Sequence, residues 1–199
     1  MDRSPGRGLW TGRTRVWTRR SSVQALLFVA AAAAFSSPAA AVELPCVRGG
    51  AAPAHLSTVQ ARHALLCLVN RERARHGLRA VRASTRLGRA AQGHAVAMTR
   101  GHFFGHVSPG GATMQARVRR TGYLRTARAW WLGEALAWGR YGTGAPSAIL
   151  ASLLASPPHR AILLDPGFRD LGIGAVHGAP QGPGAGALTV ALDFGRVLR

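Results

Sequence analysis

The chain has 199 residues and a formal net charge of +19, because 26 basic residues, all of them arginines, face only seven acids. This length favours a single domain with one hydrophobic core and argues against a multidomain protein. The charge favours anionic partners, such as phospholipid headgroups or anionic polymers of a cell envelope. The alternative is a solvated basic surface that reflects a preference for arginine codons.

Residues 1–41 are expected to be a signal peptide. Six arginines precede the apolar run 23–35, which is too short to span a bilayer comfortably, and the small residues after it fit an A-x-A cleavage site. Ordinary secretion is expected, although Arg19 and Arg20 could belong to a twin-arginine signal, and a retained signal anchor is the alternative. The mature protein would then be extracellular or held in the cell envelope without a transmembrane anchor, which makes nucleic acid a poor partner.

Residues 42–56 read as an entry segment or linker, rich in glycine, proline and alanine, ahead of a domain at residues 57–199. Cys46 lies in this segment and Cys67 in the first predicted helix. Because both are exported and an oxidising compartment favours pairing, a disulfide between them is expected. Closing a loop of this length is worth about 3 kcal/mol in the chain-entropy model.

Hydrophobic spacing, capping residues and glycine stops predict a mixed α and β domain with one sheet. The helices are expected at residues 57–76, 84–101, 113–121 and 145–155, and three strands at residues 130–138, 170–177 and 188–194. His94 lies on the apolar stripe of the second helix. A histidine there is more often a hydrogen-bonded core residue than a ligand.

Glu134 is a conspicuous residue because acids are rare in this chain. Alternation along its predicted strand puts it on the same face as the apolar Leu132 and Leu136, where an unpaired charge would be costly. Glu134 therefore needs a partner. That partner is either an N–H group or an arginine in a structural pair, or a histidine across a cleft.

Two histidines lie in segments that can present a side chain to solvent. His106 is in a loop bounded by Gly105 and by a Ser-Pro-Gly-Gly run, and His159 closely follows Ser156-Pro157. A serine before a proline is typical of a helix N-cap, so Ser156 is interpreted as a capping residue rather than as the nucleophile of a hydrolytic triad. The sequence contains no G-x-S-x-G elbow.

The segments around these residues follow one another in a characteristic order. They lie at residues 66–74, 77–78, 90–95, 98, 105–110, 133–136, 156–164, 171–174 and 193–195. Their order and spacing resemble the CAP superfamily of cysteine-rich secretory, antigen 5 and pathogenesis-related 1 proteins, and specifically its bacterial SCP-like extracellular branch. The resemblance covers most of the mature chain.

This resemblance implies an α+β fold, an α-β-α sandwich in which a small antiparallel three-stranded sheet lies between helices. It also implies a cleft lined by two histidines and two acids, of which His106, Glu134 and His159 are carried over. The second acid of the family's cleft has no counterpart in this chain, because the position aligned with it falls on Ser156 or its neighbours, none of which is acidic. Ser156 is therefore expected at the cleft without an acidic role.

Two classes of function stay open. The first is a secreted, non-catalytic module without a cofactor that binds a lipid or another anionic envelope component through the cleft. The basic surface and the lack of a recognisable nucleophile favour it. The alternative is a metal-assisted hydrolase acting on peptide or cell-wall polymer, in which His106, His159 and Glu134 supply the ligand count of a zinc site, although their spacing carries no metal motif. Neither pattern indicates an oligomeric state.

Overall fold

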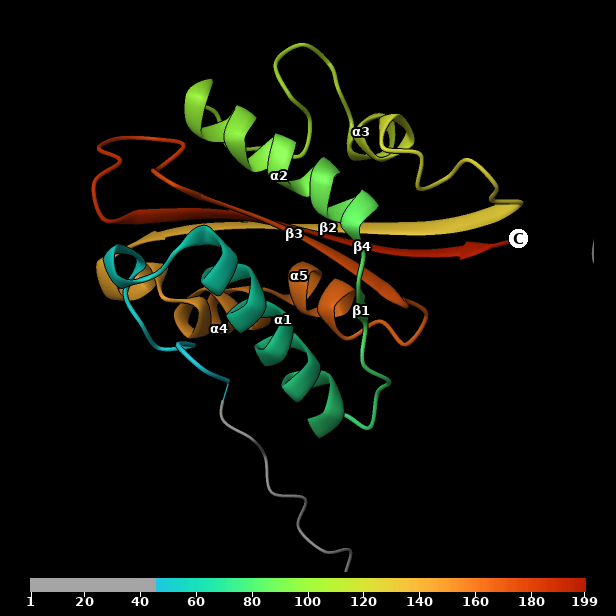
Figure 1. Ribbon diagram of the computed structural model, residues 1–199, viewed down its shortest axis with the longest axis horizontal. Helices are drawn as coiled ribbons and strands as arrows, with labels where there is room; N and C mark the ends of the chain where they lie inside the picture. The colour runs from blue at the N-terminus through green and yellow to red at the C-terminus, as the bar shows by residue number, and fades with distance from the viewer. Residues whose placement is uncertain (1–45) are drawn as a thin grey trace, which may run out of the picture. The chain divides into compact units, whose positions relative to one another are not determined.

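A four-stranded sheet lies between two layers of helices in the computed structural model, which describes residues 46–199 (Figure 1). The predicted signal peptide lies outside these residues. The helices are η1 (Pro53–His55), α1 (Thr58–Arg75), α2 (Thr85–Arg100), α3 (Met114–Arg120), η2 (Tyr141–Gly144), α4 (Pro146–Ala155) and α5 (Pro157–Leu163). The strands are β1 (Arg82–Ala83), β2 (Ala129–Arg140), β3 (Asp170–His177) and β4 (Ala187–Leu198). Helices α2 and α3 cover one face of the sheet, and α1, α4 and α5 cover the other, which confirms the α-β-α sandwich.

The strand order is β1-β3-β4-β2, with β4 antiparallel to both β2 and β3. All three predicted strands are present. The expectation of a three-stranded sheet was one strand short, because β1 pairs with β3 in parallel over Arg82 and Ala83. A strand of two residues is too short to show an alternating pattern, so local periodicity could not indicate it. One consequence matters for the site: β2 forms a free edge of the sheet.

Local side-chain chemistry explains where the long helices begin and end. Ser57 and Gln60 form a reciprocal capping box at the start of α1, and Gly77 adopts a positive φ of 66° just beyond its end. The hydroxyls of Ser84 and Thr113 accept hydrogen bonds from backbone N–H groups in the first turns of α2 and α3. These are the helix starts that the sequence predicts.

Helix α2 packs unusually closely on the sheet because β3 carries glycines beneath it. A Cβ atom at Gly172 would collide with the backbone of Leu87, and one at Gly174 with the backbone of Ala91. Only glycine allows this approach. The close packing holds α2 against β3 and thereby sets the position from which the loop at residues 101–113 departs.

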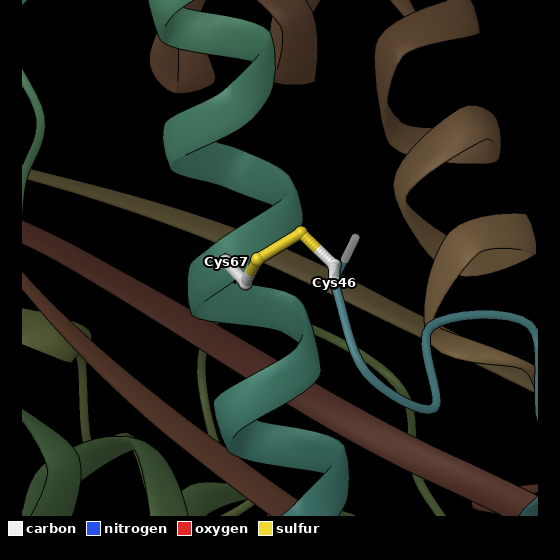
Figure 2. Close-up of a disulfide and its surroundings, with 2 residues drawn as sticks. All are labelled: Cys46 and Cys67. Atoms are coloured by element: carbon white, nitrogen blue, oxygen red, sulfur yellow. A yellow bond between two sulfur atoms is a disulfide. The ribbon is translucent and has the colours of Figure 1, made fainter. Parts of the chain in front are cut away.

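A disulfide joins Cys46 to Cys67 with a Cα–Cα distance of 5.6 Å, which confirms the predicted pairing (Figure 2). It ties the described part of the entry segment to the middle of α1. Leu56, at the end of this segment, is buried in the core between the sheet and α1. The segment at residues 46–56 is therefore anchored to the domain. No helix within residues 46–199 is long and apolar enough to cross a bilayer.

Candidate functional site

His106 and Glu134 form a hydrogen-bonded pair beside the free edge of the sheet. His106 Nδ1 lies 2.8 Å from Glu134 Oε1, and the imidazole is 57% exposed whereas the carboxylate is 3% exposed. Because an ionised carboxylate can only accept, the Nδ1–H group of His106 donates the hydrogen bond to Glu134 Oε1. The other ring nitrogen, Nε2, is then the one available to a ligand.

Arg117 on α3 completes the pairing of Glu134. Its Nη2 donates to Glu134 Oε2, and its Nη1 donates to the carbonyl oxygens of His106, at 3.0 Å, and Ala112, at 2.8 Å. Arg117 is itself buried, so this is a buried ion pair with several of its hydrogen bonds made. One guanidinium therefore neutralises Glu134 and holds the loop that presents His106.

Asp193 is a second buried acid beside this pair. It lies directly opposite Glu134 in the register of β2 and β4, and it is fully buried. Neither of its oxygens accepts a hydrogen bond from the described residues. Burial and the neighbouring charge of Glu134 raise its pKa well above the ordinary value for Asp. The raised pKa favours the neutral form of Asp193, which can donate a hydrogen bond to the carboxylate of Glu134 opposite it.

Sequence reasoning missed both Arg117 and Asp193. A signal for Asp193 was present, because alternation along residues 188–194 puts an acid on one face of an apolar strand, as it does for Glu134. Arg117 gave no comparable signal, since one arginine among many on a short helix is unremarkable. Only the packing of α3 over the sheet shows that this arginine is buried.

His159 lies on α5, in the helical layer on the opposite face of the sheet from α2 and α3 (Figure 1). Partial burial and the charge of His106 lower the pKa of His159. The two imidazoles therefore lie within electrostatic range of each other although they come from opposite layers. This is possible because β2, which carries Glu134, is the edge strand. That His106, Glu134 and His159 line one ligand cleft stays a prediction.

Ser156 occupies the N-cap position of α5, with Pro157 at the first helical position. Its hydroxyl makes no capping hydrogen bond, so proline rather than the serine side chain favours the helix start here. Among residues 46–199, no hydrogen bond joins Ser156 to a histidine.

His106, Glu134 and His159 do not fit a three-ligand zinc site. Within the described part of the chain, no group of three or more His, Cys, Asp or Glu side chains is arranged to hold a metal ion. The neighbours of Glu134 are in line with this, because Arg117 and His106 each donate to one of its oxygens and Arg117 already neutralises its charge.

His94 on α2 is fully buried behind the site and is not a ligand. Its Nε2 donates to the carbonyl oxygen of Gly105 at 2.9 Å, which secures the residue just before His106. Burial, and next the charge of Arg117, lower the pKa of His94, so the imidazole is held neutral. The interpretation of His94 as a hydrogen-bonded core residue is confirmed.

Residues 66–189 match the family described as CAP: Cysteine-rich secretory protein family. The chain belongs to this family, and the resemblance seen in the sequence is confirmed. A search of curated protein sequences finds no match.

Two similar solved structures are of bacterial proteins. One is an extracellular protein containing a SCP domain from Bacillus anthracis, with a TM-score of 0.55 and 22% identity over 72% of this chain and 44% of that chain. Another is an outer surface protein from Borrelia burgdorferi, with a TM-score of 0.59 and 16% identity over 72% of this chain and 97% of that chain. This chain thus spans less than half of the Bacillus protein, and the likeness establishes the fold.

Proposed function

We propose that this CAP-domain protein is exported and acts as a non-catalytic binding module, which takes a lipid or another anionic envelope component through the cleft around His106, Glu134 and His159. The composition of the N-terminal segment supports export, as does the description of the two structural neighbours as an extracellular and an outer surface protein. The excess of arginine supplies long-range attraction to anionic material.

The main observation behind the proposal is that the carboxylate of Glu134 is already hydrogen-bonded by other side chains of the domain. Both of its oxygens accept hydrogen bonds, one from His106 and one from Arg117. A carboxylate paired in this way is poorly suited to act as a general base or as a metal ligand, but it orients an imidazole well. His106 then offers Nε2 to a ligand from a fixed position, while the lowered pKa of His159 favours a neutral second imidazole.

The test distinguishes binding at the cleft from attraction by the general positive charge of the surface. Wild-type protein and the His106→Ala variant are sedimented with anionic vesicles and with isolated cell wall, each at low and high ionic strength. Salt screens the attraction of exposed arginines, so binding that persists at high salt reports the cleft. We expect wild type to bind at low salt, and His106→Ala to lose the binding that persists at high salt. His177→Ala, which removes an exposed histidine at the end of β3, is the matched control and should bind like wild type.

Two results would contradict the proposal. Failure of wild type to bind either material at low salt would remove the binding function. Turnover of ester or peptide substrates that is lost in Ser156→Ala, or lost on chelation, would support the hydrolase instead.

A further inference from the structure

Three hollows adjoin one another around α2 and α3, and His106 lines none of them. Their volumes are about 630, 470 and 390 Å³. Arg89 lines both the first and the second, and Arg120 lines both the second and the third. The hollows therefore form one continuous series. The term arginine track is used below for the seven exposed arginines that line it: Arg82, Arg86, Arg89, Arg119, Arg120, Arg125 and Arg199.

The positive charge of the arginine track is almost uncompensated. No acidic residue lines the second or third hollow. The first contains Asp170, but that carboxylate already accepts a hydrogen bond from the Tyr123 hydroxyl at 2.7 Å and lies 3.4 Å from Arg82. A series of concave surfaces lined by one sign of charge concentrates the field and attracts polyanions.

The shape of the arginine track indicates what kind of anion fits. A small anion would need only one hollow, and a bilayer surface would contact a flat or convex face more fully than a chain of hollows. An extended chain that bears a negative charge on successive units can engage arginines in all three hollows at once, and such multiple contacts reinforce one another. The geometry therefore favours a linear polyanion.

Trp130 indicates which class of linear polyanion fits the arginine track. It lies at the third hollow with Arg119, Arg120 and Arg125, and 38% of its surface is exposed. An exposed indole beside arginines offers an apolar face with a polar edge. The C–H face of a sugar ring can pack on such a surface, whereas a polyphosphate chain has no apolar group that could.

We propose that the arginine track binds an extended anionic polysaccharide, with a sugar ring stacked on Trp130 and successive acidic groups paired with the arginines. This goes beyond the proposed function, because His106, Glu134 and His159 line none of the three hollows, although Arg117, which holds the His106 loop, lies at the second. A protein with both surfaces would be held on a charged polymer while the cleft stays accessible.

Isothermal titration of the full mature, disulfide-bonded protein at low salt tests the proposal with a galacturonate oligomer of about ten units, which carries one carboxylate per sugar. The Arg86→Gln/Arg120→Gln variant removes one charge at the first hollow and one where the second and third hollows meet, and should weaken binding by about tenfold or more. The control is Arg79→Gln/Arg100→Gln, which removes the same charge at two exposed arginines outside the hollows and should stay within about twofold of wild type. Thermal melting verifies that all variants fold.

The sugar contact has its own test. Trp130→Leu should weaken binding of the galacturonate oligomer several-fold but leave the affinity for polyphosphate of similar charge unchanged. Equal losses for the two double-arginine variants, equally tight binding of monomeric galacturonate, or binding to anionic vesicles alone would overturn the proposal. An equal effect of Trp130→Leu on polyphosphate would overturn the sugar stacking. His106→Ala should retain oligomer binding, so failure here is distinguishable from failure of the cleft.

Discussion

Replacing Asp193 by asparagine should change how the stability of the protein depends on pH. Asp193 is fully buried opposite Glu134, and burial together with the charge of Glu134 raises its pKa well above the ordinary value of 3.8. The folded state therefore keeps a proton that the unfolded chain has lost. Asparagine has nearly the same shape, can donate a hydrogen bond to Glu134 and has no proton to lose.

The sign and magnitude of the effect follow from linkage. The contribution of Asp193 to stability is fully present below about pH 3.8 and is lost as the pH rises toward the raised pKa of the folded state. Within that window the loss is about 1.4 kcal/mol per pH unit for one proton. Asp193→Asn removes this slope, so the variant should gain stability relative to wild type at each step toward neutral pH.

Urea unfolding followed by circular dichroism, from about pH 4 to about pH 8, measures this difference. Titrating groups that do not interact with Asp193, such as His94, contribute equally to both proteins and cancel in the comparison. Glu72→Gln serves as the control, because Glu72 pairs with Arg75 and His76 on α1 and lies away from the buried acids. Parallel pH curves for wild type and Asp193→Asn would refute the assignment of Asp193 as a neutral acid.

Three further predictions concern the same domain. Cys46→Ser/Cys67→Ser should lower the free energy of unfolding by about 3 kcal/mol, since the bridge spans 21 positions, and an unchanged urea midpoint would contradict this. Glu134→Gln leaves Arg117 buried without its counterion and should lower the free energy of unfolding by about 3 kcal/mol or more. The double variant with Arg117→Met should regain part of this stability, and a double-mutant cycle measures the difference. Burial lowers the pKa of His94 in the folded state, so the free energy of unfolding of wild type should fall by about 1.4 kcal/mol per pH unit as the pH drops below 6.5. Urea titrations of His94→Gln should lack that decrease.

Local signals in the sequence were sufficient for most of the architecture. Capping residues such as Ser57 and Ser84 act on the first turn of their own helix, and alternation along a strand depends only on neighbouring residues. For this reason the long helices, the three longer strands and the disulfide could be predicted, and Glu134 could be recognised as a buried acid in need of a partner.

The identity of that partner was decided by tertiary structure alone. Arg117 reaches Glu134 because α3 packs over β2, and Asp193 lies opposite Glu134 because of the register between β2 and β4. His159 lies on α5 in the other helical layer, and only the tertiary structure brings it near enough to His106 for that charge to lower its pKa. Each contact joins segments far apart in the chain, and such contacts depend on strand order, register and layer packing, about which the periodicity of a single segment carries no information.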